Sequence, residues 1–250
     1  MSISLANGSD NSETLNTYNG KKAFSVTLTG RTLYRDGSWN TLCLPFEVST
    51  ASEPLSGEGV VAMTLNTQTS GFSNGTLTLN FDDVDGATIP AGTPFIIKWD
   101  EDTEHPTINE PTFNNVTISM ATNNATVPDV VSFTGIYSPL DITEADGDNT
   151  KLYLGAGNKL YYPSTTMTIG SCRAYFQLLG DLTAGEPEPG MQSIRSFEMN
   201  FGEEEMGIRV MEDGRGKMDD AWHTIDGRRI IGMPAAKGVY ICGGREVIIK

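Results

Sequence analysis

The sequence predicts an all-β protein: an antiparallel, jelly-roll-like β-sandwich followed by a small C-terminal β domain. Short runs rich in Val, Ile, Thr, Phe and Tyr recur along the chain, separated by clusters of Gly, Asn, Asp and Pro. This pattern is typical of strands and turns. Helical periodicity is almost absent, and many short strands without interleaved helices favour a sandwich over a parallel α/β sheet.

The strands of the first domain are expected in quick succession. Alternation is clearest in Thr76–Phe81, where Leu77, Leu79 and Phe81 face one way, as in a half-buried strand of an antiparallel sheet. The run Lys151–Leu160 predicts a hairpin that turns at residues 155–158. The other expected strands cover residues 23–28, 40–48, 60–65, 94–99, 112–120, 131–137 and 173–178.

A domain boundary is expected at residue 202, which gives a sandwich over residues 1–202 and a small β domain over 203–250. The last strand of the sandwich is expected at Ile194–Phe201, paired with Arg173–Leu178. Residues 1–200 carry 9 Lys and Arg against 23 Asp and Glu, whereas residues 201–250 carry 8 against 9. Four compact strands are expected in the second domain, held by Trp222, Val239, Ile241, Val247 and Ile249.

The net negative charge of the chain argues against two classes of partner. The chain has 17 Lys and Arg against 32 Asp and Glu, a net charge of −15. Nucleic acid and anionic membrane surfaces both need basic stripes, so neither is an expected partner. No apolar run is long enough to predict a transmembrane segment, and residues 1–8 do not resemble a signal peptide. Of a cytoplasmic protein and a segment of a longer exported chain, we favour the second.

Four aromatic residues, Trp39, Trp99, Tyr161 and Tyr162, are candidate carbohydrate-binding residues. An aromatic ring packs against the C–H face of a sugar while neighbouring Asp and Asn side chains bind its hydroxyls. The alternative is packing in the core. Trp99 shares one strand face with Phe95 and Ile97, and adjacent Tyr161 and Tyr162 point to opposite faces.

One acidic loop is a candidate calcium site. Glu144, Asp146 and Asp148 alternate as in the first half of a calcium-binding loop, but the twelfth position is Gly155 and not Glu. The alternative is a solvated turn. Beyond this possible Ca²⁺, no cofactor is expected.

No catalytic residues are expected. Residues 71–75 match the G-x-S-x-G motif, but the strand that follows Ser73 places it in a hairpin turn. Neither His105 nor His223 is placed beside a nucleophile. Cys43, Cys172 and Cys242 are expected to be small buried side chains, and the alternative is a disulfide between two of them.

Three longer segments of the sequence carry a resemblance to a known family. They are residues 31–46 (RTLYRDGSWNTLCLPF), 91–99 (AGTPFIIKW) and 173–176 (RAYF). Together they resemble a β module of large Bacteroidetes-type secreted and surface proteins. The tail, with WHTIDGRR at 222–229 and KGVYI at 237–241, resembles the sorting-type domains of type IX export. The resemblance implies export to the outer surface or the extracellular space and no known chemistry.

The leading functional hypothesis is therefore a non-catalytic, adhesin-like binding or structural module of the cell surface. Its expected partners are other domains of a larger surface protein and host or dietary glycans or proteins. The alternative is a carbohydrate-binding module of a glycan-capturing protein, and a glycoside hydrolase is a distant third. A hydrolase would need two carboxylates flanking a cleft.

Overall fold

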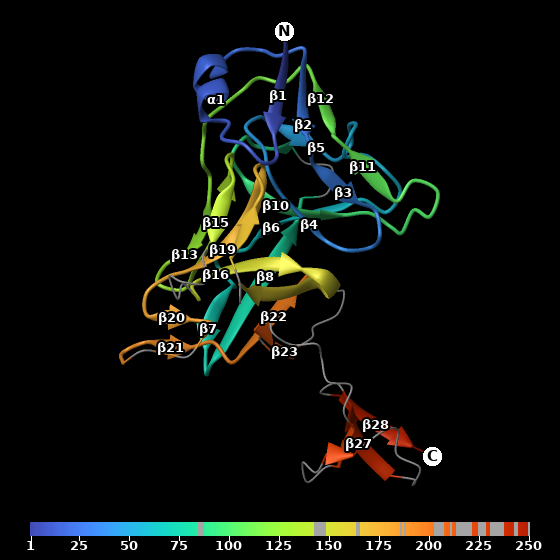
Figure 1. Ribbon diagram of the computed structural model, residues 1–250, viewed down its shortest axis with the longest axis vertical. Helices are drawn as coiled ribbons and strands as arrows, with labels where there is room; N and C mark the ends of the chain where they lie inside the picture. Colours follow the sequence, from blue (N-terminus) through green and yellow to red (C-terminus); the bar gives the residue numbers. More distant parts are fainter. Residues whose placement is uncertain are drawn as a thin grey trace. The chain divides into compact units, whose positions relative to one another are not determined.

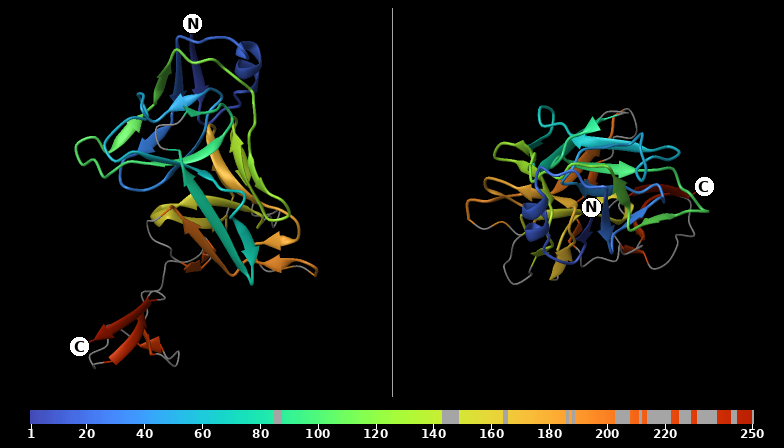
Figure 2. Two further views of the ribbon diagram at one scale, coloured as in Figure 1. Left: turned by 180° about the vertical axis from the view of Figure 1, so that it is seen from behind. Right: turned by 90° about the horizontal axis from the view of Figure 1, so that it is seen from above.

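The chain is almost entirely β-structure, 48% strand and 5% helix, as the sequence predicted. The computed structural model describes residues 1–84, 88–142, 149–163, 166–185, 187 and 189–202, and beyond these only the strand backbones of the tail. The chain divides into two compact units, Met1–Gly214 and Arg215–Lys250. Figures 1 and 2 show the strands of both units.

Two large sheets of the first unit face each other and form a sandwich. The seven-stranded sheet has the order β23-β22-β8-β6-β10-β4, with β7 added on β8, and the six-stranded sheet has the order β13-β14-β19-β16-β17-β24. The strands of the first are β4 (Asn40–Cys43), β6 (Val61–Leu65), β7 (Gly71–Ser73), β8 (Thr76–Asp83), β10 (Pro94–Lys98), β22 (Ser196–Asn200) and β23 (Ile208–Val210). Those of the second are β13 (Ala125–Val127), β14 (Val131–Ile136), β16 (Lys151–Gly155), β17 (Lys159–Tyr162), β19 (Arg173–Leu178) and β24 (Glu212–Asp213).

Smaller sheets and one helix complete this unit. A three-stranded sheet joins β1 (Ser2–Ala6), β2 (Ser25–Thr29) and β12 (Thr112–Asn114), next to helix α1 (Ser12–Tyr18) (Figure 1). A short 3-10 turn, η2 (Ala156–Asn158), links β16 to β17. The two-stranded ribbons are β3 (Thr32–Tyr34) with β11 (Thr107–Asn109), β5 (Val48–Ser49) with β9 (Thr88–Ile89), β15 (Leu140–Ile142) with β18 (Met167–Ile169), and β20 (Leu182–Thr183) with β21 (Gln192–Ser193).

The first unit contains two large hydrophobic cores, one on each face of the seven-stranded sheet. Strand β10 belongs to both, because Phe95 and Ile97 pack in one core and Ile96 in the other. The first core lies between this sheet and the N-terminal part, where α1 contributes Leu15. The second core fills the sandwich. Strands β6 and β10 of this sheet therefore form a central layer with apolar side chains on both faces.

Local patterning predicted most of the individual strands, but the expected strands at residues 40–48 and 112–120 are shorter, Asn40–Cys43 and Thr112–Asn114. Leu77, Leu79 and Phe81 are buried on one face of β8. Strands β16 and β17 form the expected hairpin. The helix α1 was not expected from the sequence. It forms the crossover between β1 and β2, which are parallel and cannot be joined by a tight hairpin.

One expected strand pair was wrong. We expected Ile194–Phe201 to pair with Arg173–Leu178, but β22 pairs in parallel with β8. Both edges of β19 are already occupied, by β14 and β16, so that β22 has no free edge there.

The tail unit is a four-stranded antiparallel sheet in the order β26-β25-β27-β28. Its strands are β25 (Trp222–Thr224), β26 (Arg229–Ile230), β27 (Gly238–Cys242) and β28 (Arg245–Ile249), close to the four expected segments. Residues 208–213, which we expected beyond the boundary at 202, pair as β23 and β24 with strands of the first unit. The side chains expected to hold the tail lie outside the described residues.

A substitution at Phe176 tests the packing of the second core. Its ring stacks on Phe133 at 4.5 Å between centroids and meets Phe81 edge-on at 6.4 Å. We expect Phe176→Ala to lower the free energy of unfolding by about 3–5 kcal/mol, because it leaves a cavity between the sheets. Tyr34→Ala, at a side chain that is 53% exposed, should change it by less than about 0.5 kcal/mol. Equilibrium urea unfolding compares the two, and equal losses would contradict this account of the core.

Candidate functional site

The structure places Trp99 in the core and not on the surface. Its side chain is 2% exposed and packs in the first core with Phe95 and Ile97. The indole N–H donates a hydrogen bond to the Leu55 carbonyl at 3.0 Å. Trp99 is thus a buried anchor, as in the core alternative considered from the sequence.

The other three candidate aromatics are not brought together with Trp99. Trp39 is 8% exposed and lies in the second core, where its ring packs against that of Phe201 with 4.9 Å between the centroids. Tyr162 packs against the same core, whereas Tyr161 stacks on Tyr153 of the neighbouring strand at 5.6 Å. The four residues therefore do not form a single sugar-binding platform.

The remaining sequence candidates do not assemble a site in the described part of the chain. Glu144, Asp146 and Asp148 lie outside the described residues. Ser73 ends β7 before a two-residue turn, Asn74-Gly75, whose φ angles of 52° and 86° suit a tight hairpin. A strand follows this turn, so Ser73 lacks the strand–turn–helix geometry of a nucleophile elbow.

The two described cysteines behave as expected. Cys43 and Cys172 are free thiols, each 2% exposed. Burial raises the pKa of both to about 12, so neither is ionised near neutral pH. This is the environment of a structural cysteine and not of a nucleophile.

A polar cleft of about 470 Å³ lies elsewhere, between β5, β9, the end of β12 and the loop that follows β5. Ligand pockets commonly fall in the range of about 300–1,000 Å³. Exposed side chains with oxygen or amide groups surround it: Glu47, Ser52, Glu53, Thr88, Asn114, Asn115 and Thr117. We refer to this site as the acidic cleft, since Glu47 and Glu53 are the only charged side chains among its described lining residues.

Three buried apolar residues form the base of the acidic cleft and tie it to the first core. Val48, Leu55 and Phe113 line the cleft and belong to that core. Phe113 also contacts Phe46, with 5.0 Å between the ring centroids. The base is therefore part of a packed interior, which holds the polar rim in place.

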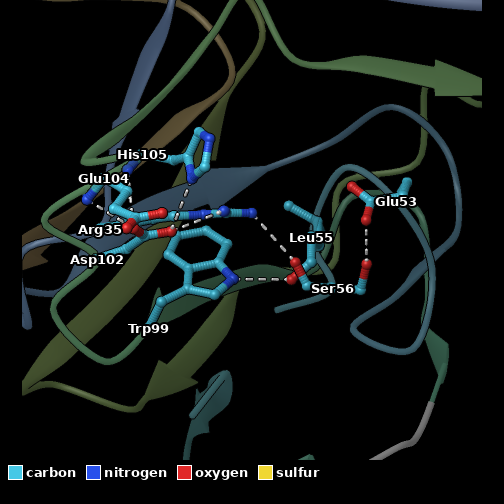
Figure 3. Close-up of polar contacts among 8 residues, drawn as sticks. All are labelled: Arg35, Glu53, Leu55, Ser56, Trp99, Asp102, Glu104 and His105. Atoms are coloured by element: carbon cyan, nitrogen blue, oxygen red, sulfur yellow. Dashed lines mark hydrogen bonds and ion pairs between the residues drawn. The ribbon is translucent and has the colours of Figure 1, made fainter. Parts of the chain in front are cut away.

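The loop at residues 50–59 forms one wall of the acidic cleft. Two side chains that do not line the cleft, Trp99 and Arg35, bind carbonyl groups of this loop (Figure 3). Trp99 binds the Leu55 carbonyl, and the Arg35 guanidinium donates to the Ser56 carbonyl at 3.2 Å. Gly57 packs so closely on the indole that a Cβ atom there would lie 2.9 Å from it. The loop is also bonded within itself, since the Ser56 hydroxyl donates to the Glu53 carboxylate at 2.8 Å.

Arg35 is itself positioned from two sides. Its guanidinium lies 5.7 Å from the centre of the Trp99 ring and 3.6 Å from the Asp102 carboxylate. The pKa of Asp102 is lowered, mainly because its carboxylate accepts the backbone N–H of His105. Asp102 thus remains ionised beside Arg35 over a wider pH range than an ordinary carboxyl group.

An exposed aromatic residue adjoins the acidic cleft at Asn115. The Asn115 N–H donates to the Phe24 carbonyl at 2.8 Å, and the Phe24 side chain is 66% exposed. Asn115 has a φ angle of 57°, a left-handed conformation that Asn adopts more readily than most residues. The backbone of Phe24 is therefore tied to the polar rim at Asn115, and its ring is accessible.

Sequence reasoning missed the residues of this cleft. They come from three separate segments, around residues 47–55, 88 and 113–117, and only tertiary folding brings them together. The available signal was weak: adjacent Asn114 and Asn115 within an expected strand, and a loop rich in Ser and Glu after another expected strand.

The comparisons with known proteins give no further guide. No family model, curated protein or solved structure matches the chain. Among the described residues, no helix has the length and apolar character needed to cross a membrane.

Trp99→Phe tests the anchoring of the loop. The substitution keeps an aromatic ring but removes the N–H that satisfies the Leu55 carbonyl. We expect a loss of about 1–3 kcal/mol in unfolding free energy and faster hydrogen exchange at the Leu55 and Ser56 amides, which bond to the Ser52 carbonyl. Trp39→Phe is the matched control in the other core. Unchanged exchange in the Trp99 variant would show that the indole does not hold the loop.

Proposed function

We propose that residues 1–214 form a non-catalytic binding module of an exported surface protein, and that the acidic cleft binds carbohydrate. The observation that carries this proposal is the lining of the cleft: hydroxyl, amide and carboxylate groups arranged around an apolar base. A sugar offers the complementary surface, since its hydroxyls both donate and accept hydrogen bonds while its C–H faces are apolar.

The charge of the cleft narrows the ligand class. Glu47 and Glu53 favour hydroxyl or amine donors, and they repel the carboxylates and sulfates of acidic sugars. The protein as a whole carries a net charge of −15, which adds to this repulsion at low salt. We therefore expect neutral or amine-bearing glycans to be preferred over acidic ones.

Glu53→Gln tests the proposed site. A glycan array first identifies the neutral polysaccharides that bind the full chain, and calorimetry with the corresponding oligosaccharides measures their affinity. Loss of a charged acceptor should weaken binding about 10- to 100-fold, since hydrogen bonds to charged groups contribute about 1.5–3 kcal/mol. Glu58→Gln is the control, because Glu58 is exposed on the same loop but does not line the cleft. Equal affinity in the two variants would place the sugar elsewhere.

Glycoside hydrolysis is the second candidate, because two carboxylates line one cleft. Retaining and inverting hydrolases both use such a pair. Release of reducing sugar from the bound polysaccharides, abolished by both Glu47→Gln and Glu53→Gln, would establish hydrolysis and overturn the non-catalytic proposal.

We also propose that the tail unit directs the protein to the cell surface. The proposal rests on the resemblance of the tail sequence to sorting-type domains, and residues 215–250 form a compact β unit of their own. Deletion of residues 215–250 should leave the first unit folded but prevent surface exposure, as measured by protease treatment of intact cells. If the shortened chain still reaches the surface, the tail is not the address. A lowered melting temperature with unchanged export would indicate a structural role instead.

A further inference from the structure

A second hollow lies beside the acidic cleft and shares a residue with it. It has a volume of about 630 Å³ and lies between the turn at residues 90–93, the end of β6 and strand β13. Thr88, an exposed residue of β9, lines both hollows. The two are therefore neighbours on either side of one short strand.

We propose that the two hollows form one extended site, and that its ligand is a linear neutral oligosaccharide that crosses Thr88. This inference rests on the proposed function of the acidic cleft. It adds that the ligand is a chain of several sugar units and not a single sugar or a disaccharide.

The β5–β9 ribbon supplies the wall between the hollows. Ser49 is paired with Thr88 and Val48 with Ile89. Val48 and Ser49 line the acidic cleft, whereas Ile89 lines the second hollow. Val48 and Ile89 are both buried in the first core, which fixes the ribbon and so the spacing of the two hollows.

The far side of the second hollow is also rigid. The Gly92 N–H donates to the Leu44 carbonyl, and the Asn123 N–H donates to the Gly92 carbonyl, both at 2.8 Å. The Asn123 side chain donates to the Ala91 carbonyl at 2.7 Å. Gly92 has a φ angle of 76°, and a Cβ atom there would lie 2.0 Å from the Ala121 carbonyl oxygen, so that only glycine fits.

The chemistry of the second hollow suits a neutral polyol. Its polar side chains are hydroxyls and one amide, from Thr64, Thr67, Thr88, Thr93, Asn124 and Thr126. No charged side chain is found among its described lining residues. A chain that carries repeated hydroxyl groups can bind here and in the acidic cleft, whereas a polyanion meets Glu47 and Glu53 at one end.

A peptide is the other extended ligand to consider, because β13 is an edge strand and two of its residues line the second hollow. Peptides that bind by strand addition gain affinity from a run of main-chain hydrogen bonds. Strand β13 has only three residues, which limits such a ladder. The threonine-rich lining favours the oligosaccharide.

Thr67→Trp tests the extended site by filling the second hollow. Thr67 is half-buried in the turn after β6, and Thr69→Trp in the same turn is the control, because Thr69 is exposed and does not line the hollow. Binding is measured by calorimetry with disaccharides and hexasaccharides of β-glucan, xylan, mannan and starch. A heptapeptide display library is screened in parallel.

We expect at least one hexasaccharide to bind about tenfold or more tightly than its disaccharide, which corresponds to about 1.4 kcal/mol. Thr67→Trp should remove this gain and leave disaccharide binding unchanged, and Thr69→Trp should do neither. Equal affinities for both lengths, with Glu53→Gln still weakening them, would overturn the extended site but not the proposed function. Absence of all oligosaccharide binding would overturn both. Peptide capture that Thr67→Trp abolishes would overturn the extended oligosaccharide site but not the proposed function of the acidic cleft, and the occupant of the second hollow would then be a peptide.

Discussion

The double burial of the central strands is the constraint on which the rest of this structure depends. Strand β10 directs Phe95 and Ile97 into one core and Ile96 into the other, so a single strand stabilises the sandwich and the N-terminal part together. A strand of this kind reads as a continuous apolar run and not as an alternating one. A polar substitution at any of these three positions would leave an unpaired polar group in one of the cores, at a cost of about 1–3 kcal/mol.

The geometry of the acidic cleft depends on the same strand. Trp99 follows β10 directly and stays in the first core, and from there its N–H holds the Leu55 carbonyl. Leu55 and Phe113 form the base of the cleft and belong to this core as well. The packed first core therefore fixes the backbone that carries the exposed side chains of Glu53 and Asn114. Such prior positioning reduces the ordering cost of binding a flexible ligand.

Local features of the fold were predictable from the sequence, and long-range pairings were not. The alternation of Leu77, Leu79 and Phe81 is a property of one strand, and so is the hairpin of β16 and β17. The partner of β22 depends on which edges are free after the sheets have formed, and no local pattern records that. The same holds for the candidate site. The core position of Trp99 could be considered from the strand face that it shares with Phe95 and Ile97. Its role as an anchor depends on the loop that packs against it, which no local pattern records.

The layered architecture also explains why the candidate site lies on loops and strand ends. Both faces of the central layer are covered, and part of the outer face of the six-stranded sheet is covered too, where Tyr175 packs with Ile142 and Ile169. Aromatic side chains at the ends of strands are also used for packing, as are Trp39, which precedes β4, and Trp99, which follows β10. Polar groups that project from turns remain available to a ligand, because turns lie at the surface where their backbone can be solvated. With these faces covered, exposed polar groups gather at the rims of the layers, and the acidic cleft is formed at such a rim.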